Sequence, residues 1–329
     1  MAYHDPADRS FVPPERGIGL TYDPECGWKS NLEAEGHPPN EGIRTGRYAD
    51  QLNDLYALAL SCPIIMDMKD AVLQTNEFPC FQYVRRPGAV NSILWPLRRV
   101  HALDSPEFCK ALDPAESKFT EKKPIVFWRG IVRGLSTFGG KKTNIKLVLN
   151  DFLQGKVSDE LLEAHLQTVP RYDFVSRYFG KAGFDVGFTA AKRLQRFKKI
   201  EMIERYRRPR ATHAEYLQHK YLLSIGGTDV GTSLGWQLGS NSMLLKEDYP
   251  WEVFFEGHFR ADEDYLLVRQ DFSDVEERVA WCEDNPDACE AMISKRHRVV
   301  PFLVDPKTLQ EAMARVVRRY EEFYRRHAA

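Results

Sequence analysis

Short apolar runs recur along this chain and alternate with segments of helical spacing, and this alternation restricts the fold more than any other feature. Each run is four to seven residues long, which suits a buried strand better than a helix. The runs expected to form strands are 62–68, 125–128, 145–149, 221–225, 242–245 and 265–268. Because strands buried on both faces read as continuous apolar runs, the pattern predicts an α/β fold with open parallel sheets.

Helices are expected between these strands. Apolar residues have helical spacing at 48–59 and 309–323. Residues 158–168 and the basic stretch 189–210, as far as Pro209, are also expected to be helical, and 234–238 to start a further helix. Three helix starts have explicit signals: a capping box at Ser273–Glu276, and proline after a cap residue at Asn285-Pro286 and Asp305-Pro306. Residues 1–45 are rich in proline, glycine and charge, and they are expected to be loop or extended chain. A chain of 329 residues is long enough for two domains.

Composition excludes several classes of protein. The formal net charge is −1, so no overall charge favours nucleic acid or a membrane surface. The six cysteines contain no C-x-x-C pair, which argues against a zinc or redox motif and against a disulfide framework. No apolar run approaches about 20 residues, and the N-terminus lacks the apolar region of a secretory signal. We therefore expect a cytoplasmic protein, with any membrane contact peripheral and at the inner face.

The residues that follow the predicted strands are the candidates for ligand binding, because ligands bind beyond the carboxyl ends of parallel strands. The segment Trp128–Gly134 follows one strand and brings Arg129, Gly130 and Arg133 together. Guanidinium groups stay charged and donate paired hydrogen bonds to phosphate, and glycine allows close backbone approach. The segment predicts a phosphate site, although a turn with two solvated arginines has the same pattern.

A glycine-rich loop, Gly226–Gly235, lies between a predicted strand and a predicted helix. Such a loop either holds a phosphate at the helix N-terminus or is a turn without a ligand. It also contains Gly231-Thr-Ser-Leu-Gly235, which has the G-x-S-x-G pattern of the nucleophile elbow in α/β-hydrolases. That elbow needs its serine directly after the strand, whereas Ser233 lies eight residues beyond Ile225. A hydrolase that uses Ser233 is therefore the weaker alternative.

Asp70 is the candidate general base. It follows the apolar run at 62–68, on the side of the sheet where ligands are expected. A carboxylate in that place can take the proton from a hydroxyl as the hydroxyl oxygen attacks an electrophilic carbon. An aspartate that merely caps the next helix would occupy the same position.

The order of several segments resembles the CAP10-like glycosyltransferases of family 90, which include the Rumi-like protein O-glucosyltransferases and bacterial lipopolysaccharide-modifying glycosyltransferases. The segments that carry the resemblance are Lys122–Gly130, His219–Gly227, Leu238–Lys246, Trp251–Phe255, Asp264–Val268 and Phe272–Trp281. They are similar to the family's lysine-led segment ending in F/W-R-G, its K-Y stretch ending in glycine, its L-x-S-x-S-x-x-L-K segment and the segments that follow. The resemblance covers about residues 120–300, and Asp264 stands where the family has a histidine.

This resemblance implies a GT-B-like fold with two Rossmann-like domains whose parallel sheets face a central cleft. The N-terminal, acceptor-side domain would comprise residues 1–122 together with the C-terminal helix 305–329, and the nucleotide-sugar-binding domain residues 123–304. It implies an inverting transfer from a UDP-sugar to a hydroxyl of a glycan, such as lipopolysaccharide or another surface polysaccharide. No metal or other cofactor is expected. The expected partners are a nucleotide-sugar donor and a glycan or lipid-linked glycan acceptor, with no nucleic acid.

Site residues follow from the same resemblance. Asp70 would be the catalytic base, and the arginines would take a metal's role in stabilising the departing diphosphate. The residues expected to bind the donor are Arg129, Gly130, Arg133, Gly227, Thr228, Ser233, Ser240, Asn241, Ser242, Lys246, Asp248, Asp264 and Tyr265. A non-catalytic module that binds a nucleotide sugar or glycan remains a further alternative.

Overall fold

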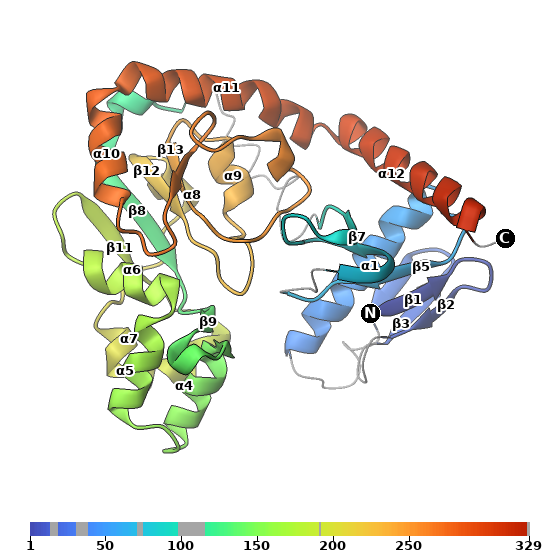
Figure 1. Cartoon of the computed structure of the whole chain (residues 1–329), viewed down its shortest axis with the longest axis horizontal. Coiled ribbons are helices and arrows are strands. Elements are labelled where there is room, and N and C mark those ends of the chain that lie inside the picture. The colour runs from blue at the N-terminus through green and yellow to red at the C-terminus, as the bar shows by residue number, and fades with distance from the viewer. Residues whose placement is uncertain (14–18, 31–38, 71–74, 98–115, 191, 328–329) are drawn as a thin grey trace. The chain divides into compact units, whose positions relative to one another are not determined.

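The structure is a computed structural model of the chain, and it describes residues 1–13, 19–30, 39–70, 75–97, 116–190 and 192–327 (Figure 1). Residue contacts divide the chain into two compact units. Unit 1 contains Met1–His101, Pro250–Gly257 and Phe302–Ala329, and unit 2 contains Ala102–Tyr249 and His258–Pro301. The contacts therefore place the first boundary at residue 101 rather than 122, and they group Pro250–Gly257 with unit 1.

Unit 1 is built on a five-stranded mixed sheet in the order β2-β1-β5-β6-β7. The strands are β1 Ala2–Asp5, β2 Ser10–Val12, β5 Ile64–Asp67, β6 Thr75–Gln82 and β7 Val90–Leu94. The last three are parallel, whereas β1 lies antiparallel to both β5 and β2. The expected α/β character is confirmed, but this sheet is only partly parallel.

The N-terminal residues differ from the expected loop. Besides β1 and β2, their described parts form a second pair of antiparallel strands, β3 Leu20–Asp23 and β4 Gly27–Ser30. Aromatic packing explains why so polar a stretch is ordered: His4 and Trp28 are buried, and their rings meet edge to face at 5.1 Å. These strands are only three or four residues long, which is too short for a clear alternation of apolar and polar residues. The proline and glycine between them therefore led to the prediction of a loop.

Two long helices belong to unit 1. Helix α1 spans Pro39–Ala57 and buries Tyr48, Leu52 and Leu55, as its helical spacing predicts. Helix α12 spans Pro306–His327, and the Asp305 carboxylate accepts a hydrogen bond from the Thr308 N–H at its start. The Tyr320 hydroxyl of α12 donates to the carbonyl of Pro63 at 2.8 Å. Since Pro63 directly precedes β5, this bond holds the helix against the start of that strand.

Unit 2 is built on a five-stranded, wholly parallel sheet in the order β11-β8-β12-β13-β14. The strands are β8 Lys123–Gly130, β11 Phe184–Phe188, β12 His219–Ser224, β13 Met243–Glu247 and β14 Leu266–Val268. The chain leaves β8 for one edge, β11, and then returns to β12 on the other side of β8. The order of the strands therefore reverses between β8 and β12, and such a switch point is where open α/β sheets bind ligands.

Helices connect these strands (Figure 1). The described helices of unit 2 are α4 Ile145–Leu153, α5 Asp159–Gln167, α6 Pro170–Tyr178, α7 Glu201–Glu204, α8 His213–Tyr216, α9 Leu234–Leu238, α10 Val275–Asp284 and α11 Pro286–Val304, of which α11 ends in residues grouped with unit 1. A short two-stranded sheet, β9 Leu135–Ser136 with β10 Thr143–Asn144, precedes α4. The helices predicted at 158–168 and 234–238 are confirmed.

Three local predictions are wrong. Residues 145–149 begin helix α4 instead of forming a strand, because the Asn144 side chain caps the helix by accepting from the Lys146 N–H. Residues 189–210 form a 3-10 helix, Lys192–Lys199, and the four-residue α7 instead of one helix. The capping box does not form, since Asp274 precedes α10 and the Ser273 hydroxyl donates to Asp271.

The core of unit 2 supplies a first prediction. Leu223 of β12 is fully buried among apolar side chains of the parallel sheet. Leu223→Ala should lower the free energy of unfolding by about 2–5 kcal/mol, because it removes buried methyl groups and leaves a cavity. Leu147→Ala is the matched control: this leucine on α4 is 58% exposed and should change the free energy little. Urea denaturation of both variants measures the difference, and equal effects would contradict the assignment of the core.

Candidate functional site

The ends of β8 and β12 approach each other closely at the switch point of unit 2. Gly134, four residues past β8, has a φ of 134°, a conformation that favours glycine. A Cβ atom on Gly134 would lie 3.3 Å from the carbonyl oxygen of Gly227, which follows β12. The predicted glycine turns after these two strands are thus neighbours. Their glycines are needed for backbone packing.

Arg171 of α6 binds three backbone carbonyls at this point. Its Nε donates to the Gly226 oxygen at 2.8 Å, and one Nη donates to the Ile225 oxygen at 3.0 Å. The other Nη donates to the Ile131 oxygen at 3.4 Å. The guanidinium therefore joins the end of β8 to the end of β12. Burial lowers the pKa of Arg171 to about 10, so the side chain keeps its positive charge at neutral pH.

Glu247, the last residue of β13, contacts the same turn. Its side chain is buried, and Oε2 accepts a hydrogen bond from the Gly226 N–H at 2.7 Å. Burial raises the pKa of Glu247 to about 7, a shift that the Gly226 hydrogen bond and the charge of Arg171 only partly oppose. The carboxyl group therefore changes its charge near neutral pH, directly beneath the glycine turn.

Arg133 and Thr228 lie at this edge, as the sequence predicts. The Arg133 Nε donates to the Thr228 hydroxyl at 3.4 Å. Gly227 has its own N–H bonded to the Asp229 carbonyl at 2.8 Å, and a Cβ atom on it would lie 3.3 Å from a terminal nitrogen of Arg171. The N–H groups of Gly226 and Gly227 are thus both used within the protein, and the side chains of Arg133 and Arg171 supply the positive charge at this turn.

Lys246 and Asp248 lie at the carboxyl end of β13, whereas Tyr265 lies just before the start of β14. The buried Lys246 ammonium is 4.0 Å from the Tyr249 ring centroid and 5.5 Å from that of Tyr265. Asp248 is exposed, and its N–H donates to the Val268 oxygen at 2.8 Å. A shallow hollow opens beside it at the ends of β13 and β14, lined by Asp248, Leu267, Val268, Arg269, Asp274, Glu277 and Arg278.

Arg129 is directed elsewhere. One Nη donates to both carboxylate oxygens of Asp185 on β11, at 2.7 and 2.8 Å, and the other donates to the Asp185 carbonyl at 2.8 Å. Only 8% of the Arg129 side chain is exposed. The glycine that follows it serves packing, since a Cβ atom on Gly130 would lie 2.4 Å from the Trp128 ring. Arg129 therefore braces β8 against β11, and the prediction that it and Gly130 line a phosphate gains no support.

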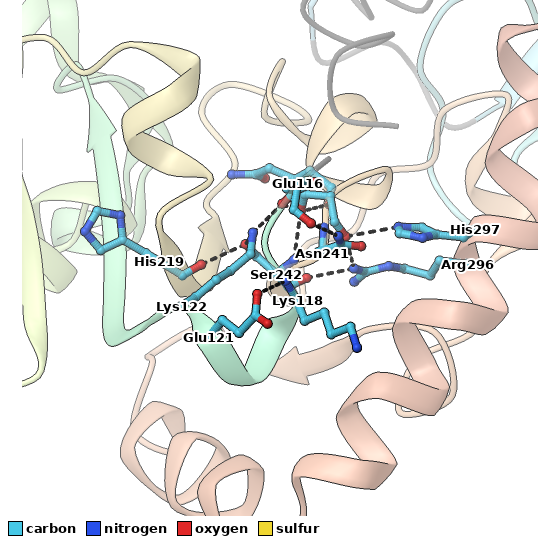
Figure 2. Close-up of polar contacts among 11 residues, drawn as sticks. Glu116, Lys118, Glu121, Lys122, His219, Asn241, Ser242, Arg296 and His297 are labelled. Carbon is cyan, nitrogen blue, oxygen red and sulfur yellow. Dashed lines mark hydrogen bonds and ion pairs between the residues drawn. The ribbon is translucent and has the colours of Figure 1, made fainter. Parts of the chain in front are cut away.

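Ser240, Asn241 and Ser242 lie at the opposite end of the sheet from Arg133. They precede β13, and in a parallel sheet the amino ends of all strands share one edge. The Ser242 hydroxyl donates to the His219 carbonyl at 2.7 Å, at the start of β12 (Figure 2). The structure thus separates this group of three predicted donor-binding residues from the group at the carboxyl ends.

A buried ionic cluster surrounds these residues (Figure 2). The Lys122 ammonium forms an ion pair with Glu116 and donates to the Ser242 hydroxyl at 2.9 Å. Burial lowers the pKa of Lys122 and raises that of Glu116, and the attraction between the two opposes both shifts. The Glu116 side chain also accepts from the Asn241 N–H at 3.0 Å. Both charged groups lie almost wholly out of water, where each depends on the other.

Arg296 of α11 completes this cluster. It is fully buried, and one Nη donates to the carbonyls of Ser240 at 2.9 Å and Ser242 at 2.7 Å. Its other Nη donates to the Asp264 carbonyl at 3.4 Å. Arg296 thereby fastens helix α11 to the residues before β13, so Ser240 and Ser242 contribute to the packing of unit 2.

Asp264 has local structural partners, and Ser233 lies away from the end of β12. The Asp264 carboxylate is buried and accepts from the Arg260 N–H at 2.7 Å, with Lys295 at 3.6 Å. Ser233 precedes the five-residue helix α9, well beyond the end of β12 at Ser224. A nucleophile elbow requires the serine in the turn that directly follows the strand. This placement argues against the hydrolase alternative.

Asp70 belongs to unit 1 and has two defined partners there. Its Oδ1 accepts from an Arg47 Nη at 2.7 Å and from the Tyr83 hydroxyl at 2.6 Å. Arg47 also lies over the Tyr83 ring, 4.9 Å from its centroid, and donates to the Met68 carbonyl at 3.1 Å. Arg47 and Tyr83 thus hold the Asp70 carboxylate just past the end of β5, where the sequence places it.

The part of the chain that the structure describes contains neither a group of metal ligands nor a membrane-spanning helix. No three or more His, Cys, Asp or Glu side chains gather there as a metal ion would require. No helix among those residues is both long and apolar enough to span a bilayer.

Sequence reasoning missed Arg171, and it included Glu247 only within the range 246–248 after an expected strand, without a role. Arg171 bonds to backbone carbonyls, and no sequence pattern marks a side chain with such partners. Glu247 had a weak signal: it directly follows Lys246 at the end of an expected strand, which is the edge where ligands bind.

The buried ion pair supplies a second prediction. Lys122→Met should lower the free energy of unfolding by about 3–5 kcal/mol, because it leaves the Glu116 carboxylate buried without its cation. Lys156→Met is the matched control, since the Lys156–Asp151 pair is exposed and 3.9 Å apart, and it should change stability little. Chemical denaturation of both variants tests this, and similar stabilities would show that Glu116 is not held by Lys122.

Comparison with known proteins shows a likeness in the second half of the chain. Residues 189–328 match the model of Glycosyl transferase family 90. The O-glucosyltransferase LpsA of Dichelobacter nodosus is 34% identical over 105 residues, which are 32% of this chain and 33% of LpsA. Protein O-glucosyltransferase 3 of Rattus norvegicus is 22% identical over 108 residues, 33% of this chain and 21% of that protein. The aligned part thus spans about a third of the first relative and about a fifth of the second.

Among solved structures, the comparison with TarM covers 87% of this chain and 48% of the TarM chain, with a TM-score of 0.38 and 11% sequence identity. A likeness this low indicates nothing about function. The matched residues 189–328 include Gly227, Lys246 and Tyr265. Arg133 and Asp70 precede them. Over residues 189–328, the resemblance to glycosyltransferase family 90 that the sequence predicts is confirmed.

Proposed function

We propose that this protein is a glycosyltransferase that moves a sugar from a UDP-sugar to a hydroxyl group of a glycan, with inversion at the anomeric carbon. The observation that carries the proposal is the group of cations at the switch point of unit 2, where Arg133 and Arg171 flank Gly227. The likeness of residues 189–328 to family 90 supports the same conclusion. So does the name of the Dichelobacter nodosus relative, an O-glucosyltransferase.

The donor site proposed here differs from the one inferred from the sequence. Arg133 binds the diphosphate, Thr228 lies beside it, and Lys246 lies at the carboxyl end of β13 with the Tyr265 ring near its ammonium. A guanidinium donates paired hydrogen bonds to phosphate oxygens, and its fixed charge stabilises the diphosphate as the bond to the sugar breaks. Transfer without a metal ion follows from this use of arginine, and it remains part of the proposal.

Asp70 acts as the general base in this proposal. It takes the proton of the acceptor hydroxyl while the hydroxyl oxygen bonds to the anomeric carbon and UDP leaves with the electrons of the broken bond. Arg47 favours the ionised carboxylate, the form that accepts a proton, and the Tyr83 hydroxyl holds the same oxygen in place. The acceptor is a glycan such as lipopolysaccharide or another surface polysaccharide. A lipid-linked acceptor would require contact at the membrane surface.

The proposed donor site yields a third prediction. In a thermal-shift panel of nucleotide sugars, a UDP-sugar should raise the melting temperature, since a ligand at 100 times its Kd stabilises a protein by about 2.7 kcal/mol. Arg133→Ala should weaken that binding by about 10- to 100-fold, because a hydrogen bond to a charged group contributes about 1.5–3 kcal/mol. The melting temperature of the free variant should stay close to that of the unmodified protein.

Arg260→Ala is the control for this measurement, because the Arg260 side chain is 76% exposed in the same unit. It should bind the donor as the unmodified protein does. If no nucleotide sugar shifts the melting temperature of the unmodified protein, the proposed function is wrong.

The proposed base yields a fourth prediction. Asp70→Asn should lower kcat by about 10²- to 10⁴-fold, the usual contribution of a general base, while the Kd for the donor stays the same. Asparagine keeps an oxygen that accepts from Arg47 and Tyr83 but cannot take a proton at neutral pH. Transfer of radiolabelled sugar measures kcat, and calorimetry measures Kd. Full transfer by Asp70→Asn would remove Asp70 from the mechanism, and donor binding without turnover on any acceptor would favour a non-catalytic binding module.

A further inference from the structure

We propose that Arg171 is a positioning residue for the donor diphosphate and that Glu247 sets the charge of the same site. The inference rests on the proposed function, because it concerns the anion that Arg133 would bind. Arg171 fixes the turn after β12 against the end of β8, and Glu247 holds that turn from below. Neither side chain needs to touch the donor for either role.

The first step of the argument concerns the carbonyls at the carboxyl edge of a parallel sheet. Strand ends at this edge direct oxygen atoms toward the ligand, and partial negative charges there oppose a diphosphate. Arg171 donates to three of these oxygens, those of Ile131, Ile225 and Gly226. It therefore replaces exposed carbonyl dipoles by a bonded cation, which favours an anion at the switch point.

The second step concerns the position of Arg133. Its side chain packs against Gly227, where an added Cβ atom would lie 3.6 Å from the Arg133 Cγ and 3.3 Å from a terminal nitrogen of Arg171. The glycine thus lies between the two arginines. Because Arg171 holds Gly226 by its carbonyl, it fixes the backbone against which Arg133 packs. Loss of Arg171 should displace Arg133 through this turn.

The third step concerns charge. The buried carboxyl group of Glu247 accepts a hydrogen bond from the Gly226 N–H. When it is ionised, it places a negative charge next to Gly226, the neighbour of the Gly227 that Arg133 contacts. Ionised Glu247 offsets the charge of Arg171 and repels a diphosphate, whereas neutral Glu247 does neither. Because charges interact more strongly inside a protein than in bulk water, this repulsion should weaken the binding of a diphosphate measurably.

The sign of the pH dependence follows. Burial raises the pKa of Glu247 to about 7, so the group is mostly neutral near pH 6 and mostly ionised near pH 8. Donor affinity should therefore fall as the pH rises through this range, and donor binding should take up a proton. The charged groups around Glu247 are Arg171, Lys246 and Asp248, and those around Arg171 also include Arg133 and Asp229.

The test uses the full-length protein and UDP-glucose, or the UDP-sugar that gives the largest shift in the panel. Neither phosphate of such a diester has the second ionisation that a phosphate monoester shows near pH 6, so the charge of the probe stays constant. Calorimetry at about pH 6 and about pH 8 should show at least about 5-fold weaker binding at the higher pH for the unmodified protein. Glu247→Gln, which keeps an oxygen for the Gly226 N–H, should bind equally at both and match the unmodified protein at the lower.

Arg171→Lys tests the positioning role. Lysine keeps the charge but cannot reach three carbonyls at once, so donor binding should weaken about 10-fold or more. Arg177→Lys on the same helix is the matched control, since its partially exposed side chain bonds to Asp173 and the Asp271 carbonyl. It should leave donor affinity unchanged. Melting temperatures without ligand separate a loss of fold from a loss of binding.

Each outcome decides one of the two proposals. Equal donor affinity in Arg171→Lys and the unmodified protein would overturn the positioning role. A pH dependence that persists in Glu247→Gln would overturn the role of Glu247. Both of these failures leave the proposed function standing, because the unmodified protein still binds the donor. If the unmodified protein binds no nucleotide sugar at either pH, the proposed function and this inference are both wrong.

Discussion

The hydrogen bonds from Arg171 to the carbonyls of Ile131, Ile225 and Gly226 are the interaction on which the candidate donor site depends. They join strands that the chain visits far apart in sequence, and they do so where the strand order reverses. Without them, two glycine turns would face each other with unopposed carbonyl dipoles. The parallel sheet supplies the geometry of this edge, and one guanidinium makes the edge suitable for an anion.

Unit 2 buries charge at both ends of its sheet, with different consequences. At the amino ends, Lys122 and Glu116 neutralise each other, and Arg296 is used up by backbone carbonyls, so the cluster holds helix α11 and offers little to a ligand. At the carboxyl ends, Arg171 also bonds to backbone carbonyls, but Arg133 lies beside it and the buried carboxyl group of Glu247 has a charge that depends on pH. A carboxyl group that titrates near neutral pH beside two arginines is what distinguishes this end of the sheet from the structural cluster at the other.

The sequence predicted the parts of the fold that have strong local signals and missed those fixed by distant contacts. Short apolar runs revealed β8, β12 and β13, regular spacing revealed α12, and proline after a cap residue located the starts of α11 and α12. Residues 145–149 were misassigned because a short apolar run suits a strand and a helix equally, and the Asn144 cap decided the outcome. The positions of Arg133 and Asp70 after strands could be predicted, because both residues follow apolar runs in the sequence. The inward turn of Arg129 could not, because it depends on Asp185 of a strand with no clear signal.

The grouping of Pro250–Gly257 with unit 1 affects how a fragment of this protein can be chosen. This segment interrupts unit 2 between β13 and β14, and its Val253 and Phe255 are buried. A fragment that runs only from β8 to β14 therefore carries this stretch but lacks Arg85, whose backbone pairs with that of Glu252. A fragment limited to residues 189–328 would begin after β11 and lack β8 as well, so β12 would become an exposed edge. The stretch that matches the family model is thus shorter than the sheet it belongs to, and a fragment with those bounds would leave out β8 and β11.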